Sequence, residues 1–244
     1  MNGEINVGHA YVNDGDLIRP ERIATGLLGA ELNHHKSGFY QIDKILKGQN
    51  WNKNIRSPLM EPGLGIKEGD FIIAVNGQTT KEMNDIYASL VGKSGTTVEI
   101  SVNSLPSESG ARKVLIQPIA NESELYYYNW VHDNIDKVNK ATNGEVGYIH
   151  IPDMGPGGLN QFVRYYYPQL RKKALIIDDR GNGGGNVSPM IIERLRRELS
   201  MMAAGRNSVS YSKPDGCLLY TSDAADDLLC VDFGCRRLIK KKTT

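Results

Sequence analysis

The first 216 residues of this 244-residue chain contain no cysteine, so no disulfide can form within them. The chain also lacks any apolar run long enough to span a bilayer. Its first residues, 1–4, offer neither a basic segment nor an apolar core, so no signal peptide is visible. We therefore expect a cytoplasmic protein, or a periplasmic one if an upstream signal peptide precedes Met1.

An excess of charge of one sign is also missing. Lys and Arg number 29 and Asp and Glu number 28, which leaves a net charge of +1. This balance gives no reason to expect nucleic acid or a charged membrane as a partner. The length is sufficient for two compact domains.

The last stretch, residues 217–244, has a composition of its own. It holds all three cysteines, Cys217, Cys230 and Cys235, and shows no clear hydrophobic periodicity. The six residues 217–222 match the translation of a transposon end used in sequencing libraries. We interpret 217–244 as a non-native tail that resembles translated sequencing adapter. The alternative is a genuine basic tail with little structure.

The most informative stretch begins with an apolar run at residues 174–177. The run ends in charged residues and then in four glycines within five positions: Gly181, Gly183, Gly184 and Gly185. A helical pattern follows from Ser188. This order predicts a buried strand, a loop with free backbone N–H groups and a helix N-terminus. Glycine lets such a loop approach an anionic or polarised oxygen closely.

Two alternatives compete with an oxygen-binding loop. The glycines could form an ordinary strand-to-helix turn. A phosphate site is weakly supported, because neither Gly-x-x-x-x-Gly-Lys-Ser/Thr nor Gly-x-Gly-x-x-Gly occurs there. We expect Asp178, Asp179 and Arg180 to brace the loop through an ion pair, and Asn182 and Asn186 to hold it by hydrogen bonds.

The surroundings of this loop predict alternating strands and helices. A helix is expected from Glu122, with Ser123 as its N-cap and His132 as a half-buried structural residue. A strand at 146–151, a helix at 159–166, the strand at 174–177 and a helix at 190–202 follow. This order is typical of a parallel sheet with crossover helices.

Residues 38–118 read as a separate unit of strands. Strands are expected at 39–46, 97–102 and 112–117, and a turn, a strand and an Asn-Gly turn at 66–77. A helix is expected at 82–91. A short strand at 26–32 precedes this unit and ends at His34 and His35, which we expect in a solvated turn rather than at a metal.

This unit resembles a PDZ domain, on the spacing Gly69-Asp70-x-Ile72-x-x-Val75-Asn76-Gly77, a helix and a Thr-Val-x-Ile strand. The resemblance implies a groove that takes an extended peptide by β-augmentation. Residues 37–40 are the best match to the carboxylate loop, so Gly38, Phe39 and Tyr40 are the predicted peptide-binding residues. They depart from the usual Gly-Leu-Gly-Phe pattern, so peptide docking is expected rather than carboxylate binding.

The segment 147–154, followed by the loop 179–185, resembles the core of the C-terminal-processing serine peptidases. Residues 186–188 and 191–195 narrow the resemblance to the tricorn protease branch, in which a PDZ domain interrupts the catalytic core. The implied fold is mixed α/β: a PDZ-like β-barrel with a capping helix, and a partial α/β peptidase core of parallel strands and crossover helices. The expected domains are an upstream core segment, the PDZ domain, the truncated core and the tail: 1–36, 37–120, 121–216 and 217–244.

The resemblance also implies a catalytic site without metal or cofactor. His9, in Gly8-His9-Ala10-Tyr11, matches the general base, although family members have serine where this chain has Gly8. A backbone N–H of Gly183 or Gly184 would supply part of the oxyanion hole. The nucleophile of the family lies in a Ser-Ala-Ser-Asp-Gly turn, and residues 1–216 contain none. Ser222 imitates that turn only faintly, and we do not assign it as the nucleophile.

The sequence therefore predicts a fragment of a serine-type peptidase that acts on oligopeptides. The fragment itself is expected to be inactive, and its parent to form homo-oligomers. The alternative is a PDZ-containing peptide-binding protein with a non-catalytic core.

Overall fold

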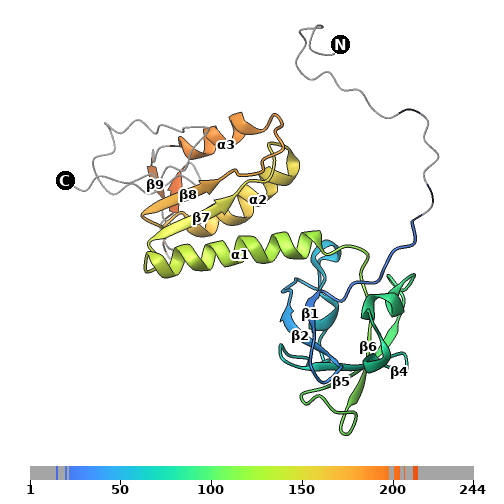
Figure 1. Ribbon diagram of the computed structural model, residues 1–244. Helices are drawn as coiled ribbons and strands as arrows, with labels where there is room; N and C mark the ends of the chain where they lie inside the picture. Colours follow the sequence, from blue (N-terminus) through green and yellow to red (C-terminus); the bar gives the residue numbers. More distant parts are fainter. Residues whose placement is uncertain are drawn as a thin grey trace. The chain divides into compact units, whose positions relative to one another are not determined.

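The computed structural model describes residues 22–197, Gly15, Pro20, Arg206 and the short segments 201–203 and 211–213 (Figure 1). His9 and the stretch 217–244 lie outside the described residues. The chain divides into two compact units, Met1–Leu125 and Tyr126–Thr244. Each unit is described by itself.

The first unit is built on a six-stranded antiparallel sheet with the order β1-β2-β3-β5-β6, to which β4 adds beside β3. Its strands are β1 (Ala30–His34), β2 (Tyr40–Ile45), β3 (Phe71–Val75), β4 (Gln78–Thr79), β5 (Val98–Asn103) and β6 (Arg112–Ile116). Two isolated bridges, Thr25 to Val91 and Leu27 to Ile119, lie outside the named strands. The predicted PDZ-like architecture and the strands expected at 39–46, 97–102 and 112–117 are confirmed, whereas the strand expected at 26–32 begins only at Ala30.

The core of this unit follows the two-residue period of its strands. Val98, Ile100 and Val102 alternate along β5, and each is fully buried. They pack with apolar residues of the neighbouring strands, such as Ile42 and Ile72. Successive side chains of a strand point to opposite faces, so one face of β5 supplies the core.

The predicted Asn-Gly turn is confirmed between β3 and β4. Asn76 has φ 48° and Gly77 has φ 81°. Positive φ at both central positions is the geometry of a tight hairpin turn whose twist matches the flanking strands. This turn explains why β4 folds back directly on β3.

The helix expected at 82–91 is wrong. The structure has two short 3₁₀ segments, Thr80–Glu82 and Ile86–Leu90, separated by extended backbone. Asp85 is the reason for the interruption, because its side chain accepts a hydrogen bond from Tyr87 N–H and restarts the helical turn. Ile86 and Leu90 still reach the core, so the apolar spacing identified buried positions but not the helix type. Further 3₁₀ turns occur at Lys53–Ile55 and Pro58–Met60.

Strand β1 lies before residue 37, where the sequence placed the start of the PDZ domain. Its five residues pair antiparallel with β2, from Ala30 with Ile45 to His34 with Tyr40. The division of the chain at 36, 120 and 216 stays a prediction.

The second unit is an α/β arrangement around two parallel strands, as predicted. Its elements are α2 (Pro156–Tyr166), a 3₁₀ turn at Tyr167–Gln169, α3 (Ser188–Leu195) and the strands β7 (Val146–His150), β8 (Ala174–Asp178), β9 (Met201–Ala203) and β10 (Tyr211–Lys213). Helix α1 (Ser123–Ala141) begins at the end of the first unit and runs through this one. Strands β7 and β8 pair in parallel, and α2 connects them.

The two faces of β7 carry different chemistry. Ile149, together with Ile151 just beyond the strand, packs with Phe162 and Tyr166 of α2. The alternate residues, Tyr148 and His150, hydrogen-bond side chains of α1. The sheet therefore has an apolar face and a polar, hydrogen-bonded face, which positions the site described below.

Two boundaries of this unit differ from the prediction. Helix α2 starts at Pro156 rather than near 159, because Asp153 Oδ1 accepts hydrogen bonds from Gly155 and Gly158 N–H and organises the first turn. The helix expected to reach 202 ends at Leu195, and Met201–Ala203 is strand β9 paired with β10. Pairing with a distant strand is not visible in local periodicity.

Candidate functional site

The glycine loop, defined here as residues 178–188, leaves the carboxyl end of β8 and enters α3. Ligands of open α/β sheets bind at this edge. The loop is tied to the chain that continues from β7: Met154 N–H donates to Gly184 O, and Val187 N–H donates to Met154 O, both at 2.8 Å. These bonds join the loop to the neighbouring strand through the backbone.

Two glycines of the loop, Gly183 and Gly185, differ in how much space surrounds them. A Cβ at Gly185 would lie 2.2 Å from Met154 O, and Gly185 has φ 141°, so this position accepts no other residue. A Cβ at Gly183 would meet nothing within 4 Å. Gly185 is thus required by close backbone approach, whereas Gly183 borders open space that a ligand can enter.

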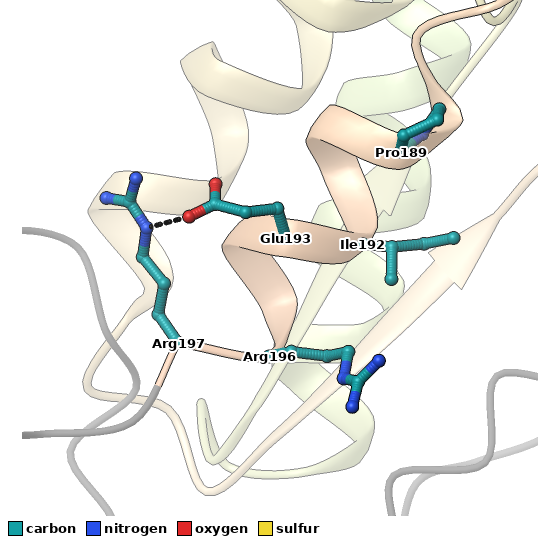
Figure 2. Close-up of a pocket in the computed structure, with 5 residues that line it drawn as sticks. All are labelled: Pro189, Ile192, Glu193, Arg196 and Arg197. Carbon is teal, nitrogen blue, oxygen red and sulfur yellow. Dashed lines mark hydrogen bonds and ion pairs between the residues drawn. The ribbon is translucent and has the colours of Figure 1, made fainter.

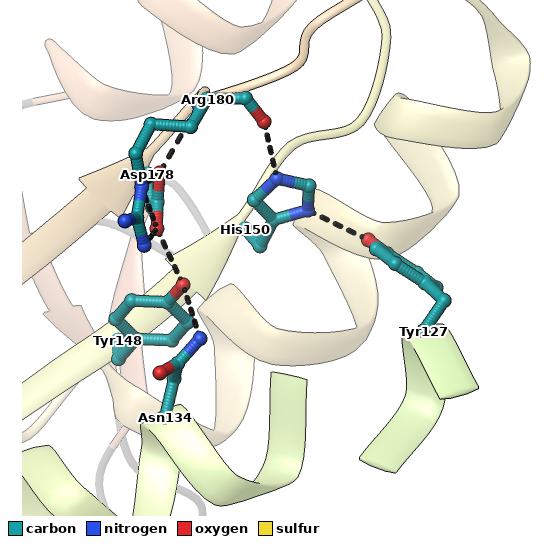
Figure 3. Close-up of polar contacts among 6 residues, drawn as sticks. All are labelled: Tyr127, Asn134, Tyr148, His150, Asp178 and Arg180. Carbon is teal, nitrogen blue, oxygen red and sulfur yellow. Dashed lines mark hydrogen bonds and ion pairs between the residues drawn. The ribbon is translucent and has the colours of Figure 1, made fainter. Parts of the chain in front are cut away.

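The predicted ion-pair brace is confirmed for Asp178 and Arg180, whereas Asp179 is exposed and makes no ion pair within the described residues. Arg180 Nη2 lies 2.5 Å from Asp178 Oδ2, and the backbone N–H of Arg180 donates to Asp178 Oδ1 at 3.1 Å. Tyr148 OH donates to the same carboxylate at 2.6 Å. Figure 3 shows this cluster around Asp178.

The environment of Asp178 shifts the acidity of two groups. Burial acts to raise the pKa of Asp178, but hydrogen bonds from Arg180 and Tyr148 outweigh it and lower the pKa to about 2. Burial, together with the hydrogen bond to Asp178 and its negative charge, raises the pKa of Tyr148 above its ordinary range. The carboxylate is therefore a permanent anion at neutral pH, and the phenol a permanent donor.

His150 is a site residue that the sequence did not identify. It is 5% exposed. Its Nε2 lies 2.9 Å from Arg180 O, and its Nδ1 lies 2.9 Å from Tyr127 OH (Figure 3). A carbonyl can only accept, so Nε2 carries a proton and donates to Arg180 O. Side chains of β7 alternate between its two faces, so His150 lies on the face opposite to that of Ile149. This alternation is the sequence signal that could have identified His150.

His150 thereby holds the peptide group that opens the glycine loop. The ring also meets Trp130 edge-on at 4.7 Å between ring centroids, and the Arg180 guanidinium lies 5.6 Å from the Trp130 ring centroid. With Asp178 on its side chain and His150 on its carbonyl, Arg180 is fixed at two points. This rigidity is what a loop needs to present backbone groups in a set direction.

The N–H groups of the two predicted oxyanion donors already have acceptors, one in the chain after β7 and one in the loop itself. Gly183 N–H donates to Pro152 O at 3.0 Å, and Gly184 N–H donates to Asn182 Oδ1 at 2.8 Å. Asn182 also donates from Nδ2 to Ile151 O at 3.0 Å, so it locks the loop as expected. The same expectation is wrong for Asn186, whose exposed side chain makes no hydrogen bond within the described residues. Donation to a substrate requires one of these N–H groups to be shared or released. The assignment of Gly183 and Gly184 stays a prediction.

The predicted peptide-binding residues lie in and after the turn between β1 and β2. Gly38 has φ 87°, and Phe39 and Tyr40 are buried. Tyr40 pairs with His34 on one side and with Ile72 on the other, so its backbone has neighbours on both edges. Peptide binding by these three residues stays a prediction, and the edge strands of this sheet are β1 and β6 rather than β2.

The other histidines that the sequence singled out have structural contacts. His132 Nε2 lies 3.2 Å from Tyr165 OH, and its ring is 4.2 Å from that of Tyr128, which confirms a half-buried structural residue. His34 is the last residue of β1, so the predicted solvated turn is wrong for it, and His35 is half-buried after the strand. Their rings contact Tyr40 and Phe71, respectively. Among the described residues, no group of three His, Cys, Asp or Glu side chains could hold a metal ion.

A shallow hollow also lies along α3 (Figure 2). It is lined by Pro189, Ile192, Glu193, Arg196 and Arg197. Arg197 Nε donates to Glu193 Oε1 at 2.8 Å, so a cation on its rim is already paired. The hollow includes none of the residues 178–186 and adds nothing to the site at the glycine loop.

Comparison with known families matches each unit. The profile described as Tricorn protease PDZ domain matches residues 26–121, and the profile of peptidase family S41 matches residues 145–206. The chain belongs to the tricorn-like proteases of family S41. This confirms the resemblance of both segments, and a tricorn-like order of PDZ domain followed by peptidase core.

Similarity to individual tricorn proteases supports the same family assignment. The chain is 35% identical over 204 residues to tricorn protease homolog 1 of Streptomyces coelicolor, covering 82% of this chain and 18% of that protein. It is 33% identical over 196 residues to the tricorn protease homolog of Saccharolobus solfataricus, covering 80% and 18%. The crystal structure of the tricorn protease superposes with a TM-score of 0.70 at 30% identity, covering 80% of this chain and 19% of that one. The tricorn-like chain thus spans about a fifth of its relatives' length.

A second homologue from the same Streptomyces bears on the last stretch. It is 34% identical over 250 residues and covers 97% of this chain, so the alignment enters residues 217–244. The non-native origin of that stretch stays a prediction. No helix of the described residues is both long and apolar enough to cross a bilayer.

Proposed function

We propose that the parent of this chain is a serine peptidase that hydrolyses peptide bonds of oligopeptides and docks peptides on its PDZ domain. The observation that carries the proposal is the glycine loop at the carboxyl ends of β7 and β8, within the segment that matches family S41. Domain limits at 1–36, 37–120, 121–216 and 217–244, assembly into homo-oligomers and a cytoplasmic location belong to the same proposal.

In this proposal His9 is the general base for a serine supplied by the parent outside this chain. His9 takes the hydroxyl proton while the serine oxygen attacks the scissile carbonyl carbon. The carbon–nitrogen bond then breaks, and the amine leaves with the proton that His9 held. Water, activated by the same histidine, hydrolyses the acyl intermediate and restores the serine.

The glycine loop stabilises the negative oxygen of the tetrahedral intermediate. A backbone N–H of Gly183 or Gly184 donates to it, and loss of one such donor raises the barrier by about 3 kcal/mol. His150 and Asp178 support this role because both hold Arg180 at the start of the loop. The loop then needs little rearrangement at the moment of reaction.

One observation favours the alternative of a non-catalytic, PDZ-containing peptide-binding protein. The N–H groups of Gly183 and Gly184 already have acceptors inside the chain. An oxyanion hole of that kind is closed unless the substrate draws an N–H away. A peptide-binding protein would retain such a loop for structural reasons alone.

The two functions are separated by substituting His9 in the intact parent protein. We expect His9→Ala to lower kcat/KM for a fluorogenic oligopeptide by about 10⁴-fold or more, because the serine loses its base. Lys137→Ala is the control, since Lys137 is exposed on α1 and belongs neither to the PDZ unit nor to the glycine loop. Its activity should equal that of the wild type.

Retained turnover in His9→Ala would remove His9 as the base, and an inactive parent would favour the peptide-binding alternative. The present 244-residue chain should show no amidolysis. Turnover by this chain that disappears in Ser222→Ala would show that the nucleophile was misassigned.

A further inference from the structure

Glu122, at the end of the first unit, has its carboxylate on a backbone site beside β1. Gly29 N–H donates to Glu122 Oε1 at 2.6 Å, and the N–H of Ala30 also hydrogen-bonds this carboxylate. Gly29 has φ 72°. These two successive backbone N–H groups converge on one carboxylate, and a concavity formed by successive N–H groups at a turn is an anion-binding nest.

The nest consists of main-chain groups only, because Gly29 has no room for a side chain. A Cβ there would lie 2.9 Å from Pro58 Cδ and 3.0 Å from Ser57 Oγ. Glycine is also the residue that adopts positive φ without strain. The site therefore recognises a carboxylate by its geometry and charge, whatever side chain accompanies it.

Glu122 reaches the nest through a short tether. Leu27 N–H donates to Ile119 O at 2.7 Å, and Ile119 N–H donates back to Leu27 O at 2.9 Å. Glu122 lies three residues after Ile119, and the nest lies two to three residues after Leu27. A ligand held this way acts at an effective concentration of about millimolar. Glu122 thus competes with any dissolved carboxylate.

The position of the nest on the sheet indicates which dissolved carboxylate fits. Strand β1 is an edge strand of the sheet, and it starts at Ala30, directly after the nest. An extended peptide that adds antiparallel to β1 has its C-terminus beside the start of that strand. Its terminal carboxylate then falls at Gly29 and Ala30, where Glu122 now lies.

We propose that Glu122 is an internal, displaceable competitor for the C-terminal carboxylate of an extended peptide that pairs with β1. The inference rests on the proposed function only for the peptide nature of the ligand. Burial raises the pKa of Glu122, and the hydrogen bonds from Gly29 and Ala30 offset this only in part. Its anion is therefore held less favourably than in water, which makes displacement easier.

The test compares Glu122→Ala with Glu124→Ala in the full chain. Glu124 is an exposed acid in the first turn of α1, so it controls for the loss of one negative charge. The probes are a fluorescein-labelled pool of hexapeptides with free C-terminal carboxylates and the same pool as C-terminal amides. Binding is measured by fluorescence anisotropy. If Glu122 fills the nest about 90% of the time, its removal tightens carboxylate binding about tenfold.

The carboxylate pool should bind Glu122→Ala about tenfold more tightly than the wild type, with the amide pool unchanged. Circular dichroism establishes that the variant is folded. Equal or weaker carboxylate binding by folded Glu122→Ala, an equal gain for amides, or no binding by any variant would each overturn the proposal. In the wild type, the amide resonances of Gly29 and Ala30 should move when the carboxylate pool is added. None of these readouts needs proteolysis, so an inactive parent would leave them intact.

Discussion

Two glycine turns of this protein present backbone N–H groups to oxygen, and they do so differently. At Gly29, in the first unit, the acceptor is the carboxylate of Glu122 at 2.6 Å. At the glycine loop of the second unit, the acceptors of Gly183 and Gly184 are the neutral oxygens of Pro152 and Asn182, at 3.0 and 2.8 Å. Both turns border the end of a strand.

The difference in acceptors indicates a binding site at Gly29 and a preorganised loop at Gly183 and Gly184. A charge-assisted hydrogen bond is shorter and stronger than a neutral one, so the N–H groups at Gly29 suit a carboxylate, although burial raises the pKa of Glu122. The glycine loop satisfies its own N–H groups with neutral acceptors and keeps its shape without a ligand. The turn at Gly29 would change when another carboxylate replaces Glu122, whereas the glycine loop is held by hydrogen bonds to the surrounding chain. The following substitutions address that contrast, starting with the largest expected effect.

Gly185→Ala should break the glycine loop. Its Cβ would lie 2.2 Å from Met154 O at a φ of 141°, so the backbone must move. We expect a loss of about 3 kcal/mol or more in the free energy of unfolding, measured by urea denaturation of the full chain. Gly183→Ala is the control, because its Cβ meets nothing within 4 Å. Equal losses in both variants would contradict the distinction between close-packed and open glycines.

Asp178→Asn should weaken the support of the loop through its charge. The pKa of Asp178 is lowered from 3.8 to about 2, which corresponds to a stabilisation of about 2 kcal/mol at neutral pH. A lowered carboxyl pKa gives stability that is present above the unfolded pKa and is lost as pH falls through the folded one. The wild type should therefore lose stability between pH 4 and about 2, and Asp178→Asn should lose less there.

Urea denaturation at several pH values in this window measures that slope. Asp179→Asn is the control, since Asp179 is exposed in the same loop. It should change the free energy of unfolding by less than about 0.5 kcal/mol. A slope in Asp178→Asn as steep as in the wild type would show that Arg180 and Tyr148 do not stabilise the charged form of Asp178.

Asn182→Ala should have the smallest effect and test whether Gly184 N–H can be released. It removes the acceptor of Gly184 and the donor to Ile151 O. We expect a loss of about 1 kcal/mol and faster hydrogen exchange at Gly184. Asn186→Ala is the control, because the side chain of Asn186, which is exposed, makes no hydrogen bond within the described residues. Unchanged exchange at Gly184 would mean that the loop is held elsewhere.

Local pattern was sufficient for much of the fold. The alternation of Val98, Ile100 and Val102 identified a strand and its buried face, and Asn76-Gly77 identified a hairpin. The apolar run before Asp178 identified β8. These elements were predictable because their causes, side-chain period and backbone preference, act within a few residues. The helix at 82–91 was wrong because Asp85 introduced a cap inside an apolar period.

The candidate site was less predictable. The ion pair of Asp178 and Arg180 is local and was expected, whereas His150 and Tyr127 were not. His150 meets Arg180 across 30 positions in sequence. A contact of that kind depends on which strands are neighbours and in what register. The sequence could not predict the hydrogen-bond partners of Gly183 and Gly184 for the same reason.

By itself, the sequence determined the two units of this protein, most of their strands and helices, and the place of a glycine loop between β8 and α3. Only the tertiary structure decided that β1 is an edge strand of its sheet, that His150 holds Arg180, and that Glu122 fills a nest 93 residues away at Gly29. The physical reason is that backbone preference and side-chain period act along the chain. The partner of a buried N–H or carboxylate is whichever group the packed sheet brings within hydrogen-bonding distance.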